Sequence, residues 1–185
     1  MTEHLRRDEA EPQQNLDHAV GFPPASRADA RVLILGSLPG RASLAARRYY
    51  AQPRNAFWPI MGRLFGAGPE LEYEQRLLRL VESRVALWDV CRSAHRPGSL
   101  DHKIDAATVA ANDFNRFFAE HGSVARVFFN GATAERLYLT SVLPKLAAPA
   151  REIATLRLPS TSPAHASLNL DRKLLAWEEV RRALA

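Results

Sequence analysis

The ten residues Arg31-Val-Leu-Ile-Leu-Gly-Ser-Leu-Pro-Gly40 decide the fold, because they join an unbroken apolar run to a glycine-containing turn. Short apolar runs rich in branched or aromatic residues recur at 85–90, 126–130 and 153–158. The first three runs, starting with 31–35, are continuous and predict strands that are buried on both faces. The run at 153–158 alternates apolar with polar residues, which predicts a strand nearer the edge of a sheet.

Segments with the length and period of helices lie between and after these strands. Strands that alternate with helices build a parallel sheet, because each parallel crossover needs a connection of about a dozen residues or more. The sequence therefore predicts an α/β three-layer sandwich, in which a central four-stranded parallel sheet is flanked by helices. Ligands of such sheets bind outside the carboxyl ends of the strands, so the loops after the strands are the places to look for a site. The expected helices cover roughly residues 56–66, 71–82, 106–121, 131–143 and 171–184.

The size and composition fit one globular domain. With 185 residues, 46% of them hydrophobic and 24% charged, the chain resembles neither a disordered segment nor a membrane protein. The first residues lack the apolar core of a secretory signal, and the single cysteine, Cys91, has no partner for an internal disulfide. We therefore expect a cytoplasmic protein, associated with the nucleoid if it is bacterial. Residues 1–20 are expected to form a flexible acidic tail, and residues 21–185 a single domain.

The charge is spread unevenly along the chain. The formal net charge is +5, but residues 1–30 hold three arginines against six acidic residues, so that residues 31–185 carry +8. A basic body suits a polyanion as partner, and it equally suits a protein whose arginines serve general solubility. The loops must decide between these two interpretations.

The first loop and its continuation hold an unusual mixture of residues. Residues 36–40 can bring backbone N–H groups close to a ligand, although a simple tight turn would have the same sequence, and the ending of a phosphate-binding loop is missing. The continuation YYAQPRNAFW, residues 49–58, precedes an apolar helix. Asn55 suits a helix N-cap, but at the mouth of the sheet its amide oxygen could also hold a water molecule. Tyr50 is either a core ring or a face on which a planar base stacks.

The other loops add polar groups. Asn130 ends the third strand and could present its amide to the edge of a base, as could Asp89 and Ser93 near the end of the second strand. The fourth loop, LPSTSPAHA at 158–166, is either a capped helix start or a rigid loop that meets a phosphate backbone. The histidines are scattered and the cysteine is isolated, so no metal site is expected.

Three segments taken together, GSLPG at 36–40, YYAQPRNAFW at 49–58 and LPSTSPAHA at 158–166, resemble the hypoxanthine-DNA glycosylase family, the deoxyinosine-excising branch of the uracil-DNA glycosylase superfamily. The resemblance covers most of the chain, and GFPP at 21–24 and GSLD at 98–101 also match. It implies the superfamily's fold around a central parallel sheet. It also implies a monofunctional glycosylase of base excision repair that flips out a deaminated base, above all hypoxanthine, and hydrolyses its N-glycosidic bond.

The resemblance also implies roles for individual residues. Asn55 matches the family's catalytic asparagine. Leu38 stands where mismatch-specific uracil glycosylases carry theirs, and Ser160 stands where many members carry a histidine, so both departures argue against a conventional uracil glycosylase. Tyr50 matches an aromatic residue that stacks on the extruded base. The implied base-binding residues are Gly36, Ser37, Leu38, Pro39, Gly40, Tyr50 and Asn130, and the implied DNA-binding residues are Arg41, Arg47, Arg48, Arg54, Ser160, Thr161, Ser162, Pro163, Ala164 and His165.

The implied chemistry follows from the charges of the reaction. Cleavage of an N-glycosidic bond develops positive charge on the sugar and negative charge on the departing base, so a site needs a water near C1′ and donors near the base. The amide of Asn55 would position that water, and backbone N–H groups of residues 36–40 would face the base. This scheme requires no metal and no cofactor. The expected partner is DNA that contains a deaminated base, bound by a monomer away from any membrane.

Three alternatives remain open. A uracil or mixed-mismatch glycosylase would share the fold and differ in its pocket. A non-catalytic DNA-lesion binding protein would keep the basic surface and Tyr50 but tolerate the loss of Asn55. A hydrolase of free nucleosides would not need the basic body, and duplex binding with a steep salt dependence would separate it from the other two.

Overall fold

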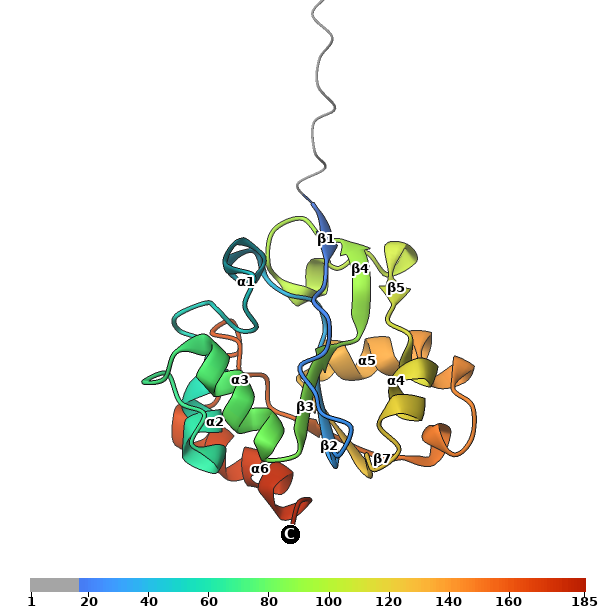
Figure 1. Cartoon of the computed structure of the whole chain (residues 1–185). Coiled ribbons are helices and arrows are strands. Elements are labelled where there is room, and N and C mark those ends of the chain that lie inside the picture. The colour runs from blue at the N-terminus through green and yellow to red at the C-terminus, as the bar shows by residue number, and fades with distance from the viewer. Residues whose placement is uncertain (1–16) are drawn as a thin grey trace, which may run out of the picture.

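The computed structural model describes residues 17–185 and has a four-stranded parallel sheet at its centre (Figure 1). The strands lie in the order β3-β2-β6-β7. The predicted α/β fold is confirmed, with strand ends shifted by one residue at most, and the predicted edge strand β7 lies at one edge of the sheet. The strand bounds are β2 Val32–Gly36, β3 Val85–Asp89, β6 Arg126–Asn130 and β7 Ala154–Leu158.

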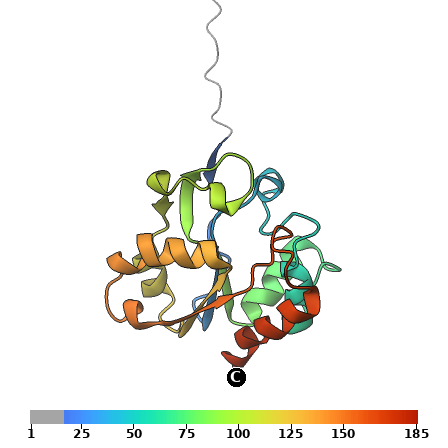
Figure 2. The same cartoon turned by 180° about the vertical axis from the view of Figure 1, so that it is seen from behind.

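The alternation of side chains along the strands divides the interior into two cores. In β2, Leu33 and Leu35 face one core, while Val32 and Ile34 face the other. Helices α4 and α5 cover the first core, and α2, α3 and α6 cover the second, so the molecule has three layers (Figures 1 and 2). The helix bounds are α2 Phe57–Phe65, α3 Tyr73–Glu82, α4 Phe114–Glu120, α5 Ala132–Ser141 and α6 Leu170–Arg182.

A small antiparallel sheet lies beyond the carboxyl end of the main sheet (Figure 1). It consists of β1 (His18–Val20), β4 (Cys91–His95) and β5 (Ala110–Ala111), and α1 (Arg41–Ala46) lies near it. The sequence did not predict this sheet. Residues 1–16 of the expected tail lie outside the described residues, but the expectation was wrong for residues 18–20, because they pair with residues 93–95 of β4.

The helix predicted over 106–121 was also wrong in its first half. The chain there forms a 3-10 turn, Ala106–Thr108, and then β5, and α4 begins only at Phe114. Polar side chains explain the break, because Asp105 caps the 3-10 turn through the Ala107 N–H and Asp113 caps α4 through the Arg116 N–H. The remaining 3-10 turns are Asp101–Lys103, Leu143–Lys145 and Ala150–Glu152.

None of the helices within residues 17–185 is both long and apolar enough to cross a membrane. Over the same part of the chain, no three histidine, cysteine, aspartate or glutamate side chains gather as ligands for a metal ion.

A candidate active site at the carboxyl ends of the strands

The turn at residues 36–40 begins where β2 ends, and its first residue has to be glycine for lack of space. A Cβ atom at position 36 would lie 2.3 Å from Oδ1 of Asp89 and 3.0 Å from the hydroxyl of Tyr50. Hydrogen bonds from the N–H groups of Val90 and Cys91 to the Gly36 and Ser37 carbonyls tie the turn to the neighbouring strand. The Cβ position of Gly36 thus lies close to both a buried carboxyl and a phenol.

Asp89 is an almost fully buried carboxyl at the end of β3. Its side chain is 4% exposed, and its Oδ2 atom has no hydrogen-bond partner within the described residues. Burial and, to a smaller extent, the nearby charge of Asp101 raise the pKa of this carboxyl from 3.8 to about 7, against the opposing charge of Arg96. The carboxyl is therefore largely protonated below neutral pH, and it can then donate a hydrogen bond.

Tyr50 packs against the second core and lies beside Asp89 at the turn. Its ring stacks on Phe57, with 4.0 Å between the ring centroids and 19° between the planes, and its buried hydroxyl finds no partner within residues 17–185. Burial, followed by the charge of Asp89, raises the pKa of this phenol above its usual range. The backbone at Tyr50 is left-handed, with φ 52°, which is unfavourable for a bulky residue and typical of strained functional sites.

Asn55 lies at the start of α2, partly buried. Its Oδ1 accepts a hydrogen bond from the N–H of Phe57, the first residue of α2, at 3.0 Å, although the N-cap position itself is Ala56. A carbonyl oxygen has two lone pairs, and one of them remains for a water molecule. The next residue, Ala56, donates its N–H to the Thr161 carbonyl at 3.0 Å, which brings Asn55 next to the fourth loop. Both views show this loop beside the segment that leads into α2 (Figures 1 and 2).

Four residues outside the fourth loop hold its residues 159–165 in place. Asn130 of β6 donates from Nδ2 to the Thr161 hydroxyl and accepts from the Thr161 N–H, both at 2.8 Å. Trp177 and Lys173 of α6 donate to the Pro159 and His165 carbonyls at 3.0 and 2.9 Å. The fourth anchor is Ala56, directly before α2, whose N–H donates to the Thr161 carbonyl. The loop is therefore a rigid element.

Two sequence-derived roles change with this geometry. Thr161 was expected to contact DNA, but its side chain is 1% exposed and its hydroxyl binds Asn130, so it supports the loop from inside. Both ends of the Asn130 amide bind Thr161, which leaves the amide oriented toward the loop. Ser160, Ser162 and Pro163 are partly buried, whereas Ala164 and His165 are exposed at the tip of the loop.

The four predicted DNA-binding arginines are exposed and lie on the segment between the turn and α2. Arg41 forms an ion pair with Asp17 at 3.2 Å, and Arg48 lies over the ring of Tyr73, 5.4 Å from its centroid. Arg47 and Arg54 complete the set. This side of the site therefore presents positive charge to a ligand, as a polyanion requires.

In the turn itself, the side chains of Ser37, Leu38 and Pro39 are buried, and Gly40 is partly exposed. What residues 36–40 can offer to a ligand is therefore backbone. The sequence did not reveal that Trp177 and Lys173 anchor the fourth loop. Both lie on the buried face of α6, where a sequence pattern indicates only core packing.

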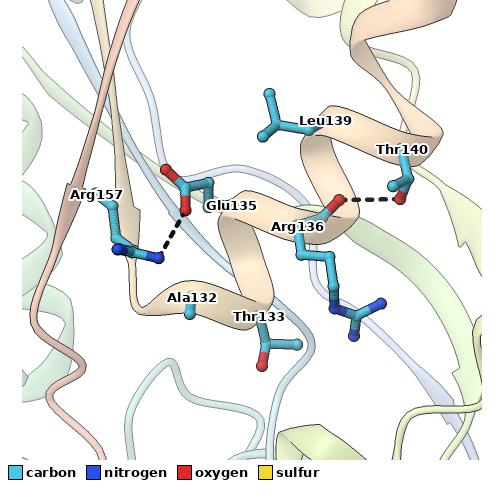
Figure 3. Close-up of a pocket in the computed structure, with 7 residues that line it drawn as sticks. All are labelled: Ala132, Thr133, Glu135, Arg136, Leu139, Thr140 and Arg157. Atoms are coloured by element: carbon cyan, nitrogen blue, oxygen red, sulfur yellow. Dashed lines mark hydrogen bonds and ion pairs between the residues drawn. The ribbon is translucent and has the colours of Figure 1, made fainter.

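A separate hollow of about 410 Å³ lies on the outer face of α5 (Figure 3). Arg157 of β7 spans it and pairs with Glu135 at 3.0 Å. The hollow shares no residue with the predicted site. Its lining residues are Ala132, Thr133, Glu135, Arg136, Leu139, Thr140 and Arg157.

Comparison with known proteins places this geometry in a family. Residues 23–182 match the family model described as the uracil DNA glycosylase superfamily. A protein of Methanosarcina acetivorans named hypoxanthine DNA glycosylase is 34% identical over 163 residues, which cover 88% of this chain and 97% of the relative. A protein of the same name from Methanosarcina barkeri is 36% identical over 112 residues, covering 60% of this chain and 70% of the relative. A solution NMR structure from Methanosarcina acetivorans, described as a candidate uracil DNA glycosylase, superimposes with a TM-score of 0.75 at 31% identity over 90% of this chain and 98% of that one.

Proposed function

The chain belongs to the uracil DNA glycosylase superfamily and is a DNA glycosylase for deaminated bases, and from this premise we propose that its substrate is hypoxanthine in deoxyinosine-containing DNA. The relatives named hypoxanthine DNA glycosylase support this choice of base. Leu38 supports it as well, because an apolar side chain stands where mismatch-specific uracil glycosylases carry a catalytic asparagine.

The reaction we propose is a hydrolysis with water as its only co-reactant. The bond between C1′ and the base breaks, and the base leaves with the electron pair and takes up a proton from solvent. The water oxygen bonds to C1′ and releases one of its protons to solvent. Asn55 holds the water through its amide oxygen, because an amide is too weak a base to deprotonate it. The sugar, which resembles an oxocarbenium ion after much of the bond has broken, then captures the water.

The observation that carries this proposal is the fixed position of the Asn55 amide. Its oxygen is held by the Phe57 N–H at 3.0 Å, and the adjoining N–H of Ala56 is bound to the Thr161 carbonyl of the fourth loop. A water-positioning group must be fixed before the reaction starts, since a loosely held amide would lose the benefit of orientation.

We further propose how the flanking elements meet DNA. A base inside a duplex is out of reach, so it must be flipped out, at a cost of roughly a few kcal/mol that is smallest for mismatched or damaged pairs. Tyr50, whose ring is backed by Phe57, stacks on the flipped base with its opposite face. The exposed arginines 41, 47, 48 and 54 bind phosphates, and the tip of the fourth loop at Ala164 and His165 approaches the backbone. Residues 21–185 act as one catalytic domain, a cytoplasmic monomer in our proposal.

The test compares base release from matched duplexes that contain one deoxyinosine or one deoxyuridine, read by alkaline strand cleavage. We expect strong cleavage at inosine, reduced by orders of magnitude in Asn55→Ala. Preference for uracil would replace the substrate and keep the family. Release of neither base by the wild-type protein would favour a lesion-binding protein that does no chemistry.

Two variants separate catalysis from capping at position 55. Asn55→Ser keeps a side-chain oxygen for the Phe57 N–H but is too short to hold the water, so it should stay as inactive as the alanine variant. Asp113→Ala removes a cap of the same kind from α4, away from the site, at a cost of about 1 kcal/mol, and should retain full activity. Activity restored in Asn55→Ser would leave Asn55 with a structural role only.

A further inference from the structure

Arg96 is a fully buried arginine directly after β4, and its guanidinium lies behind the turn at residues 36–40. The residue is 2% exposed. Its Nη1 donates to the Leu38 carbonyl at 3.0 Å, its Nη2 donates to the Pro39 carbonyl, and its Nε donates to the Gly98 carbonyl at 3.3 Å. One side chain thus joins two successive carbonyls of the turn to the loop that follows β4.

Such an arginine is costly for a fold. The ion pair that it forms within residues 17–185 is with Asp101, and the distance of 3.8 Å is long. Burial lowers the pKa of Arg96, which expresses the penalty for a charge removed from water, while the charges of Asp101 and Asp89 counteract it. A methionine would fill the same space without a charge. Unlike a methionine side chain, the planar guanidinium can donate hydrogen bonds to several carbonyls in fixed directions.

The carbonyls that Arg96 binds determine where the turn's N–H groups point. In a planar trans peptide the C=O and N–H point in opposite directions, so binding the Pro39 carbonyl turns the Gly40 N–H away from Arg96. The peptide bond before Pro39 has no N–H at all. The Gly40 N–H donates no hydrogen bond within the described part of the chain. It is therefore available to a ligand on the side opposite to Arg96.

The loop that follows β4 lies at the back of the turn together with Arg96, whose Nε donates to the Gly98 carbonyl. The N–H of Arg41 donates to the Ser99 hydroxyl at 3.1 Å, and a Cβ atom at Gly40 would meet Ser99 at 3.9 Å. The back of the turn is thus occupied by protein, whereas the Gly40 N–H points away from Arg96.

We propose that Arg96 is a positioning residue of the glycosylase: by holding the Leu38 and Pro39 carbonyls, it aims the Gly40 N–H at the departing base, where negative charge develops. This inference rests on the proposed function. It assigns a role to the Gly98-Ser-Leu-Asp101 segment too, because Arg96, Ser99 and Asp101 together form the back of the turn. Since the charge on the base appears only as the bond breaks, Arg96 should affect the rate of base release more than DNA binding.

The test uses Arg96→Met and Arg96→Lys in the full chain. Single-turnover release of hypoxanthine should fall by about a hundredfold to a thousandfold in Arg96→Met, the range found when a donor to a developing negative charge is lost. The affinity for a duplex with uncleavable 2′-fluoro-deoxyinosine should change less than threefold. Arg96→Lys keeps the charge but cannot hold two carbonyls in one plane, so its rate should lie between those of the methionine variant and the wild-type protein.

The control is Arg76→Met. Arg76 makes bonds of the same kind at a turn next to α3, where its Nε and Nη2 donate to the Leu71 and Pro69 carbonyls at 2.7 and 2.9 Å. It should lose stability without losing the rate of release. A wild-type rate in either Arg96 variant, or a defect confined to binding, would overturn the proposal. If Arg96→Met does not fold, the lysine variant alone decides, and if the wild-type protein releases no hypoxanthine, it is the proposed function that fails.

Discussion

Replacing Asp89 by asparagine should abolish a pH dependence of stability that this carboxyl imposes on the fold. The folded protein raises the pKa of Asp89 from 3.8 to about 7, chiefly because the side chain is buried at 4% exposure. The folded state therefore binds this proton more tightly than the unfolded state. Between about pH 4 and pH 7 the wild-type protein loses stability as the pH rises, and above pH 7 the loss is complete.

The size of the effect follows from the two pKa values. Each tenfold change in proton affinity is worth about 1.4 kcal/mol, so the rise from 3.8 to about 7 corresponds to roughly 4 kcal/mol. Solvent does not reduce this energy appreciably by screening, since the carboxyl is buried. Against a typical total stability of about 5–15 kcal/mol, this term is large. Asparagine has nearly the same shape as aspartate and carries no charge at any of these pH values.

The assay is urea unfolding of both proteins between pH 4.5 and pH 8.5. The difference in unfolding free energy should shift by about 3 kcal/mol in favour of Asp89→Asn across this range, since the rest of the change lies below pH 4.5. All other titratable groups are common to both proteins, so the difference isolates Asp89. Asp171→Asn, which removes an exposed carboxyl, serves as the control. Parallel stability curves would show that Asp89 is ionised in the folded protein throughout this range, as expected if Arg96 outweighs burial, and would refute the reasoning.

Three further substitutions probe the walls of the site. Gly36→Ala places a Cβ 2.3 Å from Oδ1 of Asp89, so the carboxyl has to move, and single-turnover release of hypoxanthine should fall at least about tenfold; an unchanged rate would mean that the pocket is less tightly packed. Tyr50→Ala should weaken binding of the 2′-fluoro-deoxyinosine duplex by about 1–3 kcal/mol in a titration, whereas loss of folding would assign the ring to the core. Asn130→Ala removes both bonds to Thr161 and should lower stability by about 1–3 kcal/mol, with faster hydrogen exchange confined to residues 159–165 if the amide acts as the anchor of the loop.

The main sheet could be predicted from sequence because each strand is an unbroken or alternating apolar run that tertiary contacts only reinforce. The small sheet could not, since β1 has three residues, too few to show a period, and β4 reads Cys-Arg-Ser-Ala-His, with mixed polarity. The prediction of one helix over residues 106–121 was wrong for a related reason. Its composition favours a helix, but Asn112 is tied to the sheet by its N–H to the Val90 carbonyl and by its side chain to the Asp89 carbonyl.

Sequence analysis predicted which loops meet at the site and left their internal contacts unknown. The turn, Asn55 and the fourth loop could be placed at one edge because parallel strands bring their following loops together. The partner of Asn130 lies 31 residues away, and Arg96 binds a carbonyl 58 residues away. Contacts between residues so far apart in the sequence depend on how two loops pack against each other. A local sequence pattern carries no information about that packing.

The anchoring of the fourth loop has a consequence for the newly made protein. Trp177 and Lys173, which hold the loop at both ends, belong to α6, and the ribosome makes α6 after every other element within residues 17–185. A nascent chain can complete its sheet while this loop still lacks two of its anchors. The fourth loop therefore acquires its last two anchors only once α6 is complete.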